Sequence, residues 1–144
     1  MLVAYSRPFW PLFLHVLGAM ALFGAVLAAT ILSAAAWRAP DRAYLRKATF
    51  WALLSGIPDY IVFRVGAQWI YSKEGFSGHN DPTWIGIGFA VSDAGLLLLL
   101  ASIGCAYWWQ RSGRPLAGRI VAGLSCLYLA LLAVAWLAMS GKWG

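Results

Sequence analysis

Residues 11–36 read PLFLHVLGAMALFGAVLAATILSAAA, an apolar run in which His15 is the one ionisable side chain. An α-helix needs about 20 residues to cross the hydrocarbon core of a bilayer, because each residue adds about 1.5 Å. The run exceeds that length, and a helix satisfies its own backbone hydrogen bonds in lipid. Residues 11–36 therefore predict a transmembrane helix.

Three further apolar runs of similar length follow, at residues 48–71, 84–109 and 119–140. The whole chain of 144 residues is 62% hydrophobic and 11% charged, with a mean hydropathy of +0.72. Soluble domains usually carry about 25% charged residues. The sequence therefore predicts an all-α, polytopic integral membrane protein, a four-helix bundle that forms a single domain over residues 1–144 in the lipid bilayer.

The basic residues gather in two of the predicted connections, residues 37–47 and 110–118. Seven Lys and Arg residues lie in or beside these connections, against three on the opposite side. The seven are Arg38, Arg42, Arg46, Lys47, Arg111, Arg114 and Arg119. Positive residues mark cytoplasmic connections. We therefore predict a bacterial cytoplasmic (inner) membrane protein, N-out and C-out, with residues 72–83 outside. The net charge of +6 then requires no nucleic-acid partner.

Four ionisable residues interrupt the predicted spans: His15, Asp59, Arg64 and Asp93. Such residues are costly in lipid and usually face the interior of a helix bundle. Arg64 lies about 10 Å and Asp93 about 13 Å from the outer ends of consecutive predicted helices. Similar depths predict an Arg64–Asp93 ion pair, since an arginine and a carboxylate can form bidentate hydrogen bonds. The pair is either a structural salt bridge that sets helix register or part of a substrate or proton site.

Asp59 stands out because it directly follows Gly56-Ile57-Pro58. Proline removes a helical hydrogen bond and can kink the helix. A carboxylate beside such a kink near mid-membrane is typical of ion or proton sites, although Asp59 could instead pair with Arg64. Tyr60 and Gln68, one turn on either side of Arg64, extend a polar stripe. That stripe would line a cavity or hydrogen-bond neighbouring helices.

His15 is a candidate axial ligand for haem. The other histidine, His79, lies in the predicted outer connection, so paired ligation would need two copies of His15 across a dimer. The same connection holds Glu74 and Asp81, but their spacing matches no established metal site. Asp81 before Pro82 predicts an N-cap for the third helix. We predict neither a metal site nor a bound cofactor.

Small residues recur every four positions along three of the predicted helices. They are Ala21, Ala25, Ala29 and Ser33 in the first, Gly86, Ala90 and Ala94 in the third, and Gly118, Ala122, Cys126 and Ala130 in the fourth. Small residues allow close helix approach in lipid. The stripes predict packing within one bundle or, alternatively, contact with a second protomer or a partner subunit.

The stretch Leu14-His15-Val16-Leu17-Gly18-Ala19, continuing through Phe23-Gly24, resembles the first helix of small uncharacterised bacterial membrane proteins. Those proteins are distantly similar to CopD-like copper-resistance membrane proteins and cytochrome b-type four-helix bundles. Asp93-Ala94-Gly95, followed by a run of leucines, is similar to a segment of the same proteins. The resemblance implies a four-helix bundle in a bacterial inner membrane, with His15 as a polar contact.

These observations favour a structural, accessory or assembly subunit that forms a homo-oligomer or joins a larger membrane complex. A small ion, proton or solute transporter that uses Asp59, Arg64 and Asp93 is the alternative. A haem-binding redox protein that uses His15 is the second alternative. The sequence contains no motif that names a reaction, such as HExxH or a Ser/His/Asp arrangement. We therefore expect a non-catalytic role and leave enzyme activity open.

Overall fold

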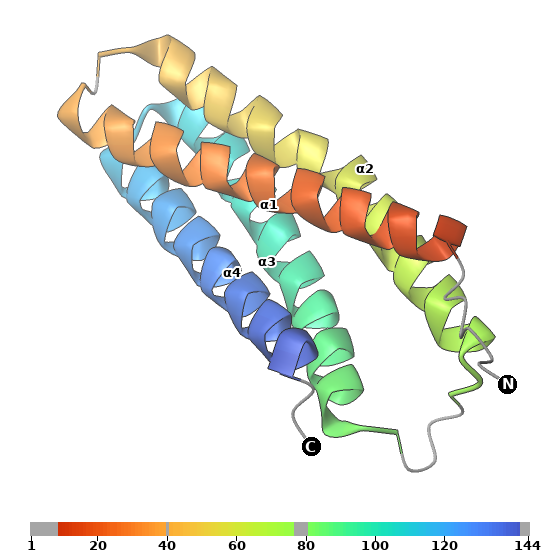
Figure 1. Ribbon diagram of the computed structural model, residues 1–144. Coiled ribbons are helices and arrows are strands. Elements are labelled where there is room, and N and C mark those ends of the chain that lie inside the picture. The colour runs from red at the N-terminus through yellow and green to blue at the C-terminus, as the bar shows by residue number, and fades with distance from the viewer. Residues whose placement is uncertain (1–8, 40, 77–80, 142–144) are drawn as a thin grey trace, which may run out of the picture.

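The computed structural model describes residues 9–39, 41–76 and 81–141, and these residues form four α-helices (Figure 1). The helices are α1 (Phe9–Arg38), α2 (Ala43–Lys73), α3 (Thr83–Ser112) and α4 (Pro115–Gly141). The predicted all-helical fold is confirmed. Each helix is longer than its predicted apolar run, because polar and basic residues continue the helical hydrogen bonding at the ends. The difference is largest at the start of α2, which includes Arg46 and Lys47.

Three of the helices, α1, α3 and α4, are long and apolar enough to cross a membrane. Helix α2 is just as long, but it is less apolar because it carries Asp59, Arg64 and Gln68 among its central and later turns. The length and composition of these three helices indicate a membrane protein.

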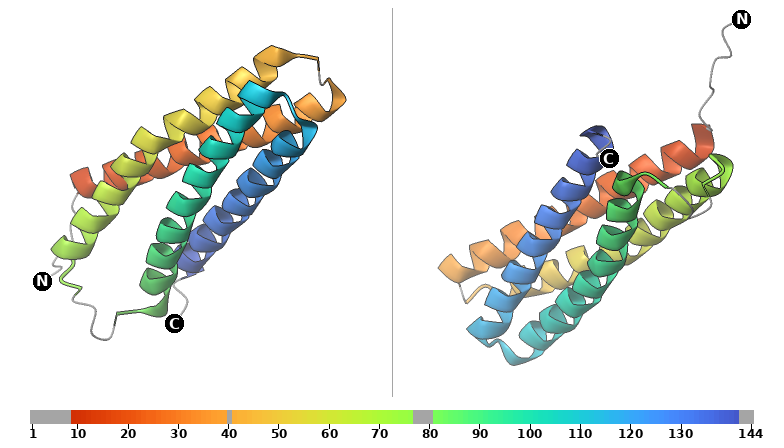
Figure 2. Two further views of the ribbon diagram at one scale, coloured as in Figure 1. Left: turned by 180° about the vertical axis from the view of Figure 1, so that it is seen from behind. Right: turned by 90° about the horizontal axis from the view of Figure 1, so that it is seen from below.

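The helices run alternately up and down and pack as two hairpins, α1 with α2 and α3 with α4 (Figure 1). Contacts of α1 with α4 and of α2 with α3 join the hairpins. The hairpins converge near the short connections after α1 and α3, and they diverge toward the other end (Figures 1 and 2). We call the end with Arg38, Ala43, Ser112 and Pro115 the closed half. The end with Phe9, Lys73, Thr83 and Gly141 is the open half.

The core lies in the closed half and at its border with the open half. Most of its buried residues lie three or four positions apart along each helix, the spacing that places them on one face of the helix. The largest fully buried apolar side chains come from all four helices: Leu22, Val26, Leu53, Leu99, Val121 and Tyr128. This shared packing defines the closed half.

Two glycines bring α1 and α2 into close contact in the open half. A Cβ atom on Gly18 would lie 3.0 Å from the carbonyl oxygen of Asp59 and would also strike the backbone of Phe63. A Cβ atom on Gly66 would lie 2.8 Å from the Cα atom of His15. Backbone cannot move aside as a side chain can, so only glycine permits this approach. The α1–α2 hairpin therefore stays closely packed where the two hairpins separate.

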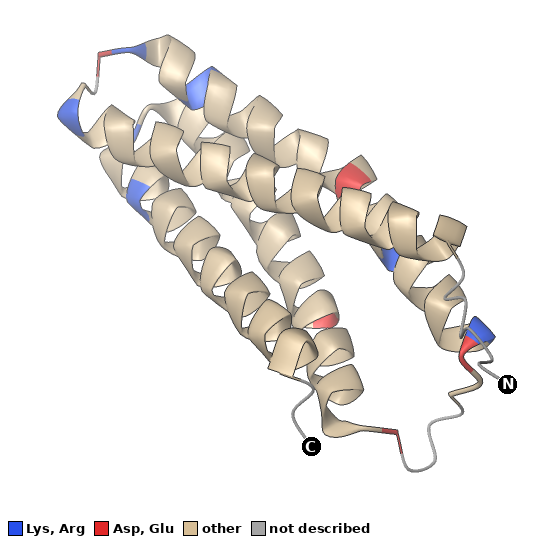
Figure 3. Cartoon of the chain, viewed as in Figure 1, with Lys and Arg blue, Asp and Glu red and all other residues tan. Residues whose placement is uncertain are grey.

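The charged residues divide between the two ends (Figure 3). The seven basic residues beside the two short connections lie at the closed end, together with Asp41. The other four acidic residues lie at the middle of α2 or in the open half: Asp59, Glu74, Asp81 and Asp93. Arg64 and Lys73 are the basic residues described in that half. The open half therefore concentrates the carboxylates of the chain.

Candidate functional site

A polar cluster joins α2 to α3 in the open half. Arg64 on α2 donates from Nη1 to the hydroxyl Oγ of Ser92 at 3.0 Å. Its Nη2 lies 3.3 Å from Oδ1 of Asp93, which confirms the predicted ion pair. The guanidinium also lies over the ring of Phe89, with Cζ 4.8 Å from the ring centroid. Helix α3 thus contributes a carboxylate, a hydroxyl and an aromatic ring that all contact the guanidinium of Arg64.

Ser92 links a second side chain to this cluster. The hydroxyl of Tyr60 donates to the carbonyl oxygen of Ser92 at 3.2 Å and lies 3.1 Å from its Oγ. Ser92 is buried, so these hydrogen bonds form in the interior of the bundle. Ser92 was not among the site residues predicted from the sequence, because a serine in an apolar helix does not by itself indicate a polar cluster. Its position four residues after Gly88 on the inner face of α3 becomes evident only from the packing.

The structure separates two of the predicted site residues from this cluster. Asp59 is half-buried, and no hydrogen bond or ion pair joins its carboxylate to another residue within the described ranges. The alternative pairing of Asp59 with Arg64 is therefore not formed. Gln68 is exposed and contributes nothing to the cluster. The predicted polar stripe on α2 thus reduces to Tyr60 and Arg64.

His15 on α1 packs against α2. Its Nδ1 lies 3.2 Å from the carbonyl oxygen of Phe63, and the two rings stack with centroids 4.8 Å apart. Because a carbonyl only accepts, Nδ1 carries the proton in this contact and Nε2 holds the lone pair. No group of three or more metal-capable side chains occurs among the residues that the structure describes. His79 lies outside those residues, and haem ligation by His15 stays the second alternative.

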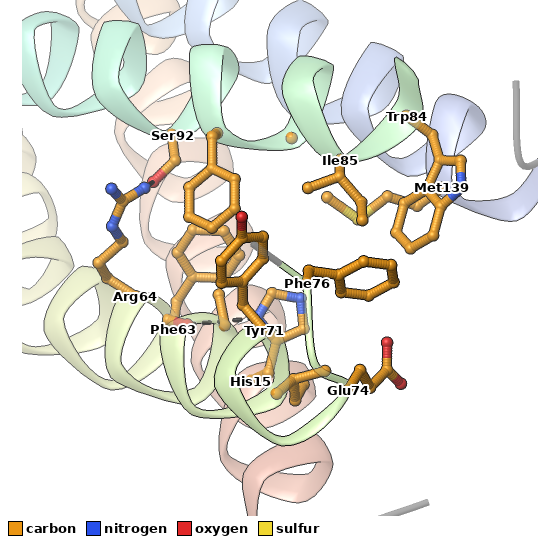
Figure 4. A pocket seen from close by; sticks show the side chains of 14 residues that line it. His15, Phe63, Arg64, Tyr71, Glu74, Phe76, Trp84, Ile85, Ser92 and Met139 are labelled. Carbon is orange, nitrogen blue, oxygen red and sulfur yellow. Dashed lines mark hydrogen bonds between the residues drawn. The ribbon is translucent and has the colours of Figure 1, made fainter. Parts of the chain in front are cut away.

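A cleft with a volume of about 90 Å³ opens between the C-terminal half of α2 and the N-terminal half of α3 (Figure 4). We call it the α2–α3 cleft. The side chains that Figure 4 labels around it are His15, Phe63, Arg64, Tyr71, Glu74, Phe76, Trp84, Ile85, Ser92 and Met139. Arg64 and Ser92 lie at one end of the cleft, and Glu74, Phe76 and Trp84 lie toward the other.

Four aromatic rings line the α2–α3 cleft in a chain of contacts, and we call them the aromatic wall. The ring of Tyr71 meets Phe89 edge to face at 5.4 Å between centroids and lies 5.8 Å from Phe76. Phe76 in turn meets Trp84 edge to face at 6.4 Å. The wall therefore runs from the end of α2 through the following turn to α3.

Two acidic side chains stand near the aromatic wall. Glu74 is half-buried, caps the end of α2 and lines the cleft. Asp81 does not cap α3 as predicted, because the N-cap position is Pro82 and no side-chain cap bond forms there. The carboxylate of Asp81 instead accepts a hydrogen bond from the hydroxyl of Tyr71 at 2.7 Å. This bond holds Tyr71 in the wall and directs a second carboxylate to the same end.

A second hollow, of about 690 Å³, lies between α1 and α4 on the other side of the open half. It is almost entirely apolar, with Phe23, Leu132 and Trp136 among its lining residues. His15, Phe63, Ser92 and Met139 line both hollows. These side chains form a thin partition through the open half, where the two hairpins no longer pack together.

The outer face of α3 carries a row of small exposed residues that one leucine interrupts. Its small members are Gly86, Ala90, Ala94, Ala101 and Gly104, and Leu97, which is 69% exposed, lies between Ala94 and Ala101. Asp93 lies in the part of the row before Leu97, with 69% of its side chain exposed. In contrast, Ala29 and Ser33 on α1 and Gly118 and Ala122 on α4 are buried within the bundle. Of the three predicted stripes, the one on α3 is therefore the one that the protomer leaves uncovered along its length.

Comparisons of this chain with protein-family models, with curated proteins and with solved structures found no match. Two features of the open half, the α2–α3 cleft and the exposed face of α3, are therefore the basis of the functional proposals.

Proposed function

We propose that this chain is a non-catalytic accessory subunit of a bacterial inner membrane. It crosses the bilayer four times, N-out and C-out, and binds another transmembrane helix through the outer face of α3. The bound helix belongs to a second copy of the chain or to a larger membrane complex. The position of Asp93, exposed on that face, is the observation that carries the proposal.

Asp93 lies about 15 Å along α3 from Thr83, well inside a helix about 45 Å long. At that depth the exposed side of its carboxylate would face hydrocarbon, where a charged group is costly. Arg64 satisfies Oδ1 from within the protomer. A neighbouring helix that offers a hydroxyl, an amide or a basic group would satisfy the rest of the carboxylate and shield it from lipid.

The small residues around Asp93 support the same interpretation. A Cβ atom on Gly86 or on Gly104 would meet nothing within 4 Å, so the space beside this face is open in the protomer. Small residues in such a row let a second helix approach closely, and close approach is what stabilises helix pairs in lipid. The face therefore combines a polar anchor with a surface suited to helix docking.

The transporter alternative has less support, because no buried charged residue occurs among the described residues of the closed half, whose buried polar side chains are serine and threonine hydroxyls. Leu53, Leu99 and Val121 are almost completely buried there and fill the space between the helices. A hydrophilic path within one protomer would have to displace this core. Asp59 near the middle of α2 is the one group that favours transport, and it would need an oligomer to complete a path.

The test compares assemblies extracted from membranes with their native lipid. We expect the wild-type chain to migrate as a complex much larger than its 15.7 kDa protomer. Replacing Ala90 by Leu places a bulky side chain on the docking face and should release a monomer. The matched control is Ala21→Leu, an equally exposed alanine on α1. A wild-type monomer, or equal behaviour of the two variants, would contradict the proposal.

A further inference from the structure

We propose that the α2–α3 cleft binds a small organic cation, a lipophilic amine or quaternary ammonium group attached to an apolar body. The cation would lie against the aromatic wall beside Glu74. This site is separate from the docking face of α3, and the inference stands whether or not the chain is an accessory subunit.

The aromatic wall supplies the surface that such a cation prefers. The faces of aromatic rings carry negative electrostatic potential and attract cations within about 6 Å of the ring centroid. The cleft already shows this contact at one end, where the guanidinium of Arg64 lies 4.8 Å from the centroid of Phe89. Toward the other end, Tyr71, Phe76 and Trp84 continue the wall beside the imidazole of His15, and no lysine or arginine occurs there among the described lining residues.

The charges around the cleft favour a cation over an anion. Arg64 is the one lysine or arginine among the described residues that line the cleft, and it is engaged by both Asp93 and Ser92. The imidazole of His15 also lines the cleft, with Nδ1 3.2 Å from the carbonyl oxygen of Phe63. Glu74 also lines the cleft, and neither a hydrogen bond nor an ion pair of its carboxylate occurs within the described ranges. Lys73 is exposed and does not line the cleft. The charges of Arg64 and Asp93 balance each other, so the remaining charge at the cleft is the negative charge of Glu74.

The remaining lining selects the kind of cation. Ile70, Ile85 and Met139 make the cleft largely apolar, so a ligand that binds there needs an apolar body. A divalent metal ion requires several oxygen or nitrogen ligands, and Glu74 is the one carboxylate among the described residues that line the cleft. An organic monocation satisfies one carboxylate and several rings at once, without a coordination shell.

The experiment uses three probes that share a benzyl group and differ in charge: benzyltrimethylammonium, its neutral carbon analogue neopentylbenzene, and benzylsulfonate. Binding to the full chain in nanodiscs of zwitterionic lipid is measured by calorimetry, with empty nanodiscs subtracted. We expect the cation to bind at least about tenfold more tightly than the neutral analogue, because the charge interacts with the rings and with Glu74. Equal affinities, or preference for the sulfonate, would overturn the proposal.

Two variants locate the site. Glu74→Gln and Trp84→Leu should each weaken binding of the cation by roughly three- to tenfold and leave the neutral analogue nearly unchanged. Asp41→Asn, an exposed acid at the closed end, is the matched control and should bind as the wild type does. Unchanged cation binding in Glu74→Gln would overturn the assignment. The wild-type preference among the three probes tests the proposal even if a variant fails to fold.

Discussion

The closed and open halves of the bundle are held together by different interactions. In the closed half, all four helices share one apolar core, and the buried hydroxyls of Ser33 and Thr49 donate within their own helices, to the carbonyls of Ala29 at 2.7 Å and Leu45 at 2.8 Å. In the open half, the hairpins separate and polar groups bond between helices. Arg64 reaches Ser92 and Asp93, and Tyr60 reaches Ser92. Apolar packing fixes one end, whereas a few polar bonds set the spacing at the other.

This difference matters because the two kinds of contact respond differently to change. A packed core has no alternative arrangement of similar energy, so its helices stay in place. A small number of polar bonds can be exchanged for bonds to a ligand or to a partner helix at modest cost. We therefore expect the closed half to carry most of the stability, and the open half to carry the binding functions.

The largest expected effect is the loss of a core side chain in the closed half. Leu99 is completely buried and packs against Gly56 on α2 as well as within the core cluster. Leu99→Ala should lower the free energy of unfolding in detergent by about 2 kcal/mol or more, because a cavity remains among all four helices. The control is Leu97→Ala, whose side chain is 69% exposed two residues away. Similar losses for both variants would refute a core that is concentrated in the closed half.

A smaller effect is expected when the polar cluster of the open half is broken. Arg64→Met removes the bonds to Ser92 and Asp93 and should lower the free energy of unfolding by about 1 kcal/mol. It should also broaden the distance between spin labels at the exposed positions Ser72 and Thr83, because the bonds set the spacing of α2 and α3 there. Electron paramagnetic resonance measures that distance.

The labels for this experiment require replacement of the two free cysteines, Cys105 and Cys126, by serine. Arg119→Met on α4, an exposed arginine at the closed end, serves as the control and should leave the distance distribution unchanged. If Arg64→Met leaves the distribution as narrow as in the wild type, then apolar contacts, and not the polar cluster, set the width of the open half.

The smallest effect concerns two buried serines of the closed half. Ser102 on α3 and Ser125 on α4 are each 1% exposed, and neither hydroxyl oxygen has a hydrogen-bond partner among the described residues. Ser102→Ala should change the free energy of unfolding by less than about 0.5 kcal/mol or stabilise slightly, because it removes an unsatisfied polar atom. Ser33→Ala, which loses a hydrogen bond, should be the more destabilising of the two. The reverse order in chemical denaturation would indicate that Ser102 has a partner in the membrane.

Part of the candidate site followed from the sequence. Depth along a helix depends only on residue number, so the similar depths of Arg64 and Asp93 were enough to predict their ion pair. The roles of Asp81 and Ser92 did not follow. Asp81 bonds to Tyr71 across the turn between α2 and α3 and does not cap α3. These contacts depend on how two helices are rotated and spaced, which the order of residues along one helix does not specify.

The sequence by itself determined the four helices, the basic end of the bundle and the position of each ionisable residue along its helix, because apolar length, charge placement and the rise per residue are properties of single segments. Only the tertiary structure decided that the hairpins diverge, that a cleft forms between α2 and α3, and that the stripe of small residues on α3 faces outward. Those features arise from contacts between segments. The close approach of α1 and α2 at Gly18 and Gly66 holds one hairpin together, and the core around Leu99 joins the two hairpins at the closed end.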